Sequence, residues 1–183
     1  GPGTKLISLG QATWDDMLDS YTEQAKGLLD GGIDAFIIET CQDILQIKCA
    51  INACLDALAS VDKTTDDIPI MVSITIETTG TMLVGSDLQT VVHALAPFPI
   101  LSLGLNCATG PELMESHVAW LSKHWNGFIS VVPNAGLPEL VDGCAHFPLS
   151  AHAFGASMKR FVDQYGVNIV GGCCGTTPSH IAS

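Results

Sequence analysis

The feature that most constrains the fold is the alternation of five short apolar runs with longer segments of helical periodicity. Each run is continuous rather than interrupted by polar residues at every second position, which is typical of strands that are buried on both faces of a parallel sheet. Strands that alternate with helices predict βαβ units and hence an α/β fold with a parallel sheet. The runs are Ile33–Glu39, Ile70–Ile76, Ile100–Asn106, Phe128–Pro133 and Val167–Gly172.

The segments between the runs carry apolar residues at helical spacing, together with residues that start and stop helices. Thr13 is expected to cap the first helix, and Gly31 with Gly32 to end it. Asp43 is expected to cap the second helix rather than to take part in chemistry. The predicted helices are Trp14–Asp30, Asp43–Leu58, Asp87–Leu95, Pro111–His124 and Ala151–Tyr165, with one more beginning at Pro178.

The spacing of the runs bounds the architecture. Successive runs begin about 30 to 40 residues apart, close to the ~31 residues of one unit in a (β/α)8 barrel. The chain has 183 residues, which leaves it two or three strands short of a barrel. Spacing alone therefore leaves two alternatives, an open doubly wound sheet or a part of a barrel, and one domain over residues 1–183 in either case.

Composition and charge exclude several classes of protein. The chain is 47% hydrophobic and 14% charged, which indicates a folded domain with a sizeable core rather than a disordered chain. Seven basic residues against nineteen acidic ones give a formal net charge of −12 and argue against nucleic acid or a membrane surface as partner. The longest apolar runs are strand-sized, so neither a transmembrane helix nor a signal peptide is expected.

Cysteine usage indicates the compartment. Seven is an odd number, and two of the cysteines are neighbours, which favours a reduced, cytoplasmic protein over a disulfide framework. Four of the seven are expected to be small buried hydrophobic residues: Cys41, Cys49, Cys54 and Cys144.

The other three cysteines follow predicted strands, where the chemistry of parallel α/β folds is found. Cys107 follows one strand, and Cys173 with Cys174 follows another, among glycines that let the backbone turn so that both side chains can face one point. Three thiolates that converge at the mouth of a barrel predict a zinc site with one open position, the pattern of catalytic zinc. The six histidines form no metal spacing and are expected at the surface or in packing.

Several segments resemble a known family. GLNCATGPE (Gly104–Glu112), VPNAGLP (Val132–Pro138) and NIVGGCCGTTPSHIA (Asn168–Ala182) closely resemble the homocysteine-binding module of the cobalamin-dependent methionine synthases, within the homocysteine S-methyltransferase superfamily. GPGTKL (Gly1–Leu6) and IETCQDILQIKCAI (Ile38–Ile51) are similar to the middle of that module. The GGCCG motif with an upstream NC is highly specific for the superfamily. The resemblance implies a (β/α)8 barrel whose fourth to eighth strands are the five runs here. It also implies that the first three strands, the family's Asp-Gly-Ala-Met-Gly-Thr segment and most of the final helix are missing.

The resemblance also implies roles for individual residues. Cys107, Cys173 and Cys174 would be the zinc ligands and the catalytic residues, and Asn134 would approach zinc when substrate is absent. Glu39 matches a glutamate that would pair with the ammonium group of homocysteine; the alternative is a carboxylate that stabilises the following helix. Thr176 and Thr177 are expected to cap the last helix, and the alternative is a hydrogen bond to substrate.

The expected chemistry follows from the thiolate site. A free thiol has a pKa of about 8.5, and its thiolate is the nucleophile. Zinc that binds the homocysteine thiol would displace its proton at neutral pH, and the thiolate would attack a methyl group to give methionine. The resemblance implies methylcobalamin on a separate domain or protein as donor, reloaded by methyltetrahydrofolate on another. The alternatives are a betaine- or S-methylmethionine-dependent homocysteine S-methyltransferase, and an inactive zinc-binding fragment whose unclosed sheet has open edges.

Overall fold

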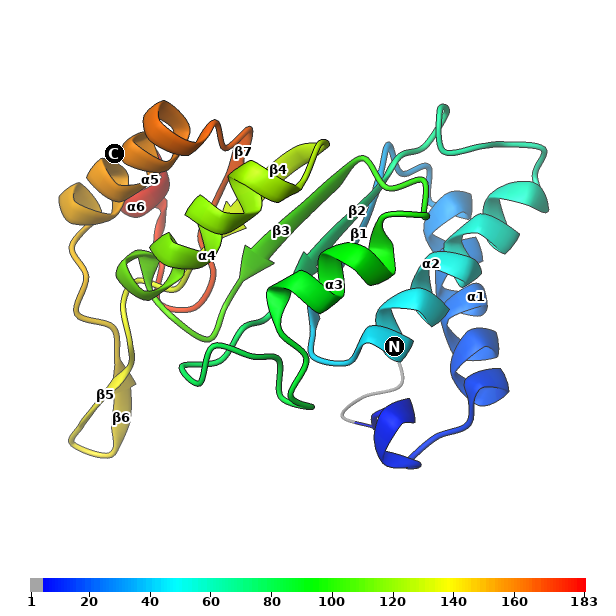
Figure 1. The fold of residues 1–183 in the computed structure, drawn as a ribbon, viewed down its shortest axis with the longest axis horizontal. Helices are drawn as coiled ribbons and strands as arrows, with labels where there is room; N and C mark the ends of the chain where they lie inside the picture. The colour runs from blue at the N-terminus through cyan, green and yellow to red at the C-terminus, as the bar shows by residue number, and fades with distance from the viewer. Residues whose placement is uncertain (1–4) are drawn as a thin grey trace.

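A five-stranded, all-parallel sheet organises residues 5–183, the part of the chain that the computed structural model describes (Figure 1). The first four residues of the GPGTKL segment therefore lie outside the described residues. In spatial order, the strands are β1 (Phe36–Cys41), β2 (Ile70–Ile74), β3 (Ser102–Asn106), β4 (Phe128–Val132) and β7 (Ile169–Val170). The prediction of an α/β fold with a parallel sheet is confirmed.

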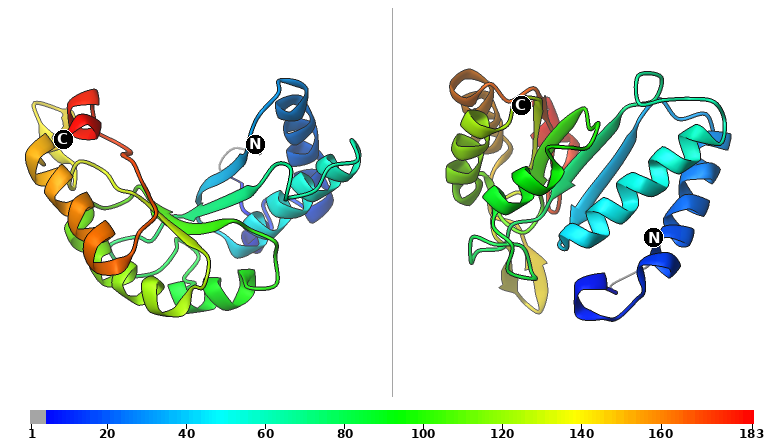
Figure 2. Two further views of the ribbon diagram at one scale, coloured as in Figure 1. Left: turned by 90° about the horizontal axis from the view of Figure 1, so that it is seen from above. Right: turned by 45° about the vertical axis from the view of Figure 1, so that its right-hand side comes forward.

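The order of the strands in the sheet follows their order in the chain, without a reversal. A doubly wound sheet reverses its strand order at a switch point, so that alternative from the sequence is wrong. The sheet is also strongly curved. Figure 2 (left) shows helices along its convex side and an uncovered concave side. Phe36 of β1 lies opposite Ile70 of β2, and Ser102 of β3 lies opposite Phe128 of β4.

The helices begin and end close to where the sequence predicts. Thr13 caps α1 by accepting a hydrogen bond from the Asp16 N–H at 3.1 Å, and Asp43 caps α2 by accepting one from the Leu45 N–H at 2.9 Å. The helices are α1 (Trp14–Asp30), α2 (Ile44–Ala59), α3 (Leu88–Leu95), α4 (Pro111–His124), α5 (Ala151–Tyr165) and α6 (Pro178–Ala182), with a short 3-10 helix η1 (Ile7–Leu9) before α1.

The core lies between the sheet and the helices on its convex side. All five residues of β3, the central strand, are buried. Large side chains from the helices are fully buried against the strands, among them Ile47 and Ile51 of α2 and Phe154 and Phe161 of α5. Because this apolar layer extends from β1 to β4, it holds the ends of these strands in fixed relative positions. No helix within residues 5–183 combines the length and apolar character needed to cross a bilayer.

Two predictions from the apolar runs need correction. The first run is predicted to be buried on both faces from Ile33, but β1 begins at Phe36 and three of its six residues are exposed, with Ile37 52% exposed. The reason is that β1 is one of the two edge strands and the concave side beside it is uncovered. The last run forms only the two residues of β7.

A β-hairpin that the sequence does not predict lies between β4 and α5. Strands β5 (Glu139–Val141) and β6 (Cys144–His146) pair antiparallel, and all six of their residues are exposed. Cys144 is therefore exposed, not buried as expected, whereas Cys41, Cys49 and Cys54 are buried. The available signal was the Asp142-Gly143 pair, whose positive φ angles of 50° and 77° are typical of a two-residue hairpin turn.

Candidate metal centre

Cys107 is the first residue after β3, and a tight turn directs the chain there. Cys107 and Ala108 both adopt the left-handed conformation, with φ of 60° and 56°. The Cys107 N–H donates to the carbonyl of Val132 at 3.1 Å, and the Thr109 N–H donates to the carbonyl of Cys107 at 2.6 Å. These bonds hold Cys107 beside the carboxyl end of the neighbouring strand β4.

Cys173 and Cys174 follow β7 and are tied to the segment after β4. The Cys173 N–H donates to the carbonyl of Pro133 at 2.9 Å, and the carbonyl of Cys174 accepts from the Ala135 N–H at 2.9 Å. Gly175 then turns the chain with a φ of 77°, in the left-handed region that glycine tolerates. The glycine-rich turn thus brings both cysteines to the end of the sheet that carries Cys107.

The three sulfur atoms converge. The Sγ atom of Cys174 lies 3.8 Å from that of Cys107 and 3.9 Å from that of Cys173, and all three lie within 4.8 Å of one another. In a tetrahedral site with Zn–S bonds of about 2.3 Å, sulfur atoms are about 3.8 Å apart. Across residues 5–183, this is the one group of three or more Cys, His, Asp or Glu side chains placed to share a metal ion, and it contains no histidine.

Whether Cys173 is protonated depends on whether a cation is bound beside it. Burial, together with the hydrogen bond and the negative charge of Cys107, raises the pKa of Cys173 to about 12. Without a cation, this thiol therefore keeps its proton at neutral pH. A bound divalent cation reverses the balance, because it stabilises the thiolate directly. The donor set and its spacing therefore fit a zinc ion.

Asn134 lies beside the cluster. It is buried, and its Oδ1 atom accepts a hydrogen bond from the Cys174 N–H at 3.1 Å. Its own N–H donates to the carbonyl of Thr109 at 3.1 Å. In this structure, the asparagine therefore joins the two cysteine-bearing segments through its side chain and its backbone.

Glu39 lies further away, on the edge strand β1, with β2 between it and the strand that leads to Cys107. Its side chain is exposed, and its carboxylate makes no hydrogen bond or ion pair with the described residues. The structure thus leaves this carboxylate free at the carboxyl end of the sheet.

The two threonines after the cysteine pair differ in what they do. Thr177 caps α6, as expected, and its N–H donates to Nδ1 of His180 at 3.1 Å. Thr176 is not the capping residue; its hydroxyl donates to the carbonyl of Cys173 at 2.6 Å and closes the turn of the cysteine pair.

Sequence reasoning missed a buried polar residue directly before Cys107. Asn106 is 1% exposed, and its side chain bonds to residues of two other strand ends. The signal in the sequence was an asparagine at the end of an otherwise apolar run, where an amide side chain must find partners within the core.

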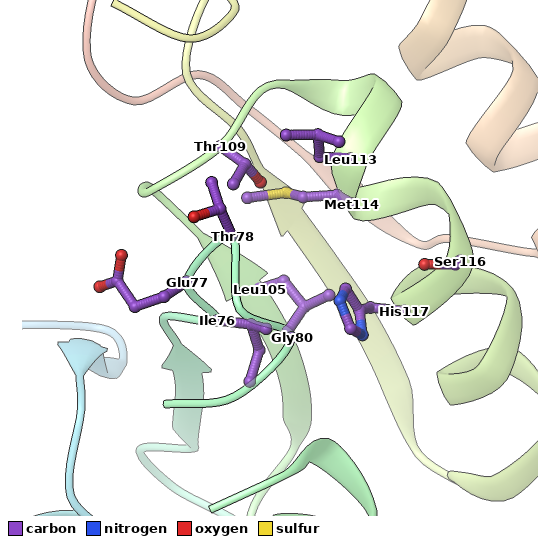
Figure 3. Close-up of a pocket in the computed structure, with 10 residues that line it drawn as sticks. All are labelled: Ile76, Glu77, Thr78, Gly80, Leu105, Thr109, Leu113, Met114, Ser116 and His117. Carbon is purple, nitrogen blue, oxygen red and sulfur yellow. The ribbon is translucent and has the colours of Figure 1, made fainter. Parts of the chain in front are cut away.

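A small cavity of about 200 Å³ adjoins the loop that carries Cys107 (Figure 3). Thr109 and Met114 form one side of it, and Glu77 with the residues after β2 forms another. Burial lowers the pKa of His117, which faces the cavity from α4, so the imidazole favours its neutral form. None of the three cysteines is among the residues that line this cavity.

Comparison with known proteins gives a consistent set of similarities. The family profile described as "Homocysteine S-methyltransferase" matches residues 1–183. The chain is 46% identical over 181 residues to "Methionine synthase" of Mycobacterium leprae (strain TN) and 45% identical to that of Mycobacterium tuberculosis (strain ATCC 25618 / H37Rv). Each match covers 99% of this chain but only 15% of the relative, so the chain spans a small part of these curated relatives.

Solved structures share the fold. The apo form of the homocysteine methyltransferase MmuM from Escherichia coli superposes with a TM-score of 0.69 at 23% identity, over 93% of this chain and 56% of that one. Its metallated form gives a TM-score of 0.64 at 23% identity, over 90% of this chain and 50% of that one.

Proposed function

The chain belongs to the homocysteine S-methyltransferase family, and from that premise we propose that residues 1–183 form part of a homocysteine-binding, zinc-dependent module of the methionine synthase type. The observation that carries the proposal is the convergence of the sulfur atoms of Cys107, Cys173 and Cys174 at the carboxyl end of the sheet. Three protein sulfurs leave one position of a tetrahedral zinc ion for a substrate.

The five parallel strands are the fourth to eighth of a (β/α)8 barrel in this proposal. The unreversed strand order, the curvature of the sheet and its open concave side support it, since each is what a barrel cut along its axis would have. The solved relative of which the chain covers 56% supports it as well. The cysteines then lie at the end of the barrel where active sites of this fold are built.

The residues of this chain would bind the zinc ion and the substrate. Cys107, Cys173 and Cys174 would bind zinc, which would supply Lewis acidity and so deprotonate a bound homocysteine thiol at neutral pH. Asn134 would keep the Cys174 segment in place through its hydrogen bond to the Cys174 N–H. Glu39, whose carboxylate is free, would pair with the substrate ammonium.

The substrate sulfur would then form a bond to a methyl carbon, while the bond between that carbon and its donor breaks and leaves its electron pair on the donor. The thiol proton goes to solvent, and the product is methionine. Methylcobalamin on a separate domain or protein is the proposed donor, with methyltetrahydrofolate as the source that reloads it. The support is the similarity over 99% of this chain to proteins named methionine synthase.

A titration of the zinc-loaded protein with homocysteine tests this function. We expect one zinc ion per chain and the release of about one proton per homocysteine bound in weakly buffered solution at neutral pH. Stoichiometric zinc without proton release would instead indicate an inactive zinc-binding fragment. Methionine formation, measured with methylcobalamin, betaine and S-methylmethionine in parallel, identifies the donor; transfer from betaine or S-methylmethionine but not from methylcobalamin would contradict the methionine synthase type.

A further inference from the structure

One buried side chain joins the carboxyl ends of three strands. Oδ1 of Asn106, at the end of β3, accepts from the hydroxyl of Ser73 in β2 at 2.7 Å and from the N–H of Thr40 in β1 at 3.1 Å. Its Nδ2 atom donates to the hydroxyl of Thr40 at 2.7 Å. The main-chain carbonyl of Asn106 also accepts from the hydroxyl of Thr75 at 3.2 Å. Both polar atoms of the amide are therefore used between strands.

The backbone on both sides of this junction is strained. Thr40 has a φ of 58° and Cys107 a φ of 60°, in the left-handed region that residues with a Cβ atom rarely adopt and that is least favourable for a β-branched residue. The register of β1 on β2 also shifts between Ile38 and Cys41. The two hydrogen bonds between Asn106 and Thr40 stabilise this conformation, because Oδ1 accepts from the Thr40 N–H and Nδ2 donates to the Thr40 hydroxyl oxygen.

Asn106 thereby fixes the backbone beside one proposed substrate contact and one proposed zinc ligand. Glu39 directly precedes Thr40, and Cys107 directly follows Asn106. Glu39 and Cys107 are not in contact, because β2 lies between their strands. The Asn106 amide is the direct side-chain link between the ends of those two strands.

We propose that Asn106 is a positioning residue that fixes the separation between Glu39 and the sulfur site, so that homocysteine can engage both with its ammonium and its sulfur at once. The inference rests on the proposed function. A short carbon chain joins the amino and thiol groups of homocysteine, so both ends bind only if their two protein partners are correctly spaced. A small displacement of either partner lowers the affinity for homocysteine, because binding of one end of the molecule then no longer places its other end against the second partner.

The test compares two thiols on the zinc-loaded protein by isothermal titration calorimetry: homocysteine, and the mercaptobutyrate that lacks only its amino group. In the unsubstituted protein, we expect homocysteine to bind on the order of tenfold more tightly, the contribution of one charged hydrogen-bonded pair. Asn106→Ala is expected to abolish this preference while zinc content and the affinity for the mercaptobutyrate change little. Glu39→Gln is expected to abolish the preference as well, and the double variant to lose nothing more.

A matched pair at Thr40 keeps the test valid if Asn106→Ala does not fold. Thr40→Val removes the hydroxyl partner of Nδ2 and is expected to reduce the preference, whereas Thr40→Ser keeps the hydroxyl and is expected to retain it. A preference unchanged in Asn106→Ala or Thr40→Val overturns the proposal, as does an equal loss of affinity for both thiols, which marks a general structural role. If the unsubstituted, zinc-loaded protein binds neither thiol, the proposed function itself is overturned. This outcome is distinct from failure of the Asn106 proposal, because it is observed before any residue is substituted.

Discussion

Cys173 and Cys144 offer a matched pair of substitutions, because one thiol belongs to the sulfur cluster and the other lies on the exposed hairpin. Cys173→Ser is expected to lose stoichiometric zinc on dialysis, since a hydroxyl is a much poorer ligand for zinc than a thiolate. Cys144→Ser is expected to keep one zinc per chain. Metal analysis after dialysis measures both, and retention of zinc by Cys173→Ser would mean that the ligand set is wrong.

Individual residues differ in how far the sequence predicts their place. The convergence of Cys107 with the Cys173-Cys174 pair is predictable, because glycines and strand ends are local signals that say where side chains gather. The role of Asn106 is not, because its partners Thr40 and Ser73 lie 66 and 33 positions away and meet it only through strand register. Periodicity predicts a strand but not its register on a neighbour.

At the scale of elements, the N-caps of α1 and α2 are expected to contribute differently to the free energy of unfolding. Asp43 is buried and accepts hydrogen bonds from the Leu45 N–H, the Ser8 N–H and the Ser8 hydroxyl at 2.9, 3.0 and 2.6 Å. Thr13 is exposed and accepts one backbone bond. Asp43→Ala is therefore expected to lower the free energy of unfolding by about 2–3 kcal/mol, against about 1 kcal/mol for Thr13→Ala. Urea unfolding measures both, and equal losses would contradict this account.

The elements also separate what local sequence predicts from what it does not. Helices such as α4 and α5 match their predicted bounds, because caps and apolar spacing lie within the helix itself. The hairpin β5–β6 was missed because all six of its residues are exposed, so it has no apolar alternation to reveal it. β1 begins three residues after its predicted start, at Phe36, where its pairing with β2 begins.

For the whole molecule, the uncovered edge of the sheet predicts self-association. Within residues 5–183, β1 pairs with β2 alone, and its Ile37 side chain is 52% exposed. Open apolar edges pair with other chains, and a lysine on the edge suppresses this. Ile37→Lys is expected to lower concentration-dependent association of the 183-residue chain in sedimentation velocity experiments. Leu140→Lys, on the hairpin, is the control; if it alone lowers association, the hairpin is the contact and not β1.

Buried thiols make the stability of the whole molecule depend on alkaline pH. Burial raises the pKa of Cys41 and of Cys54 from 9.0 to about 12. Between these values the unfolded thiols have lost protons that the folded thiols retain, so the folded state binds more protons and the free energy of unfolding falls as pH rises. The stabilisation is complete below pH 9 and is lost progressively towards pH 12. Cys54→Ala removes one such group, whatever its effect on packing at neutral pH.

The quantity to measure is therefore the slope of the free energy of unfolding against pH, rather than its value at a single pH. Under reducing conditions, urea unfolding of the chain and of Cys54→Ala is followed at several pH values between 9 and 12. The dependence of the free energy of unfolding on pH is expected to be shallower in the variant by up to one proton, about 1.4 kcal/mol per pH unit. Identical slopes would mean that Cys54 titrates alike in the folded and unfolded chains, and that burial in the α2 core does not protect its proton.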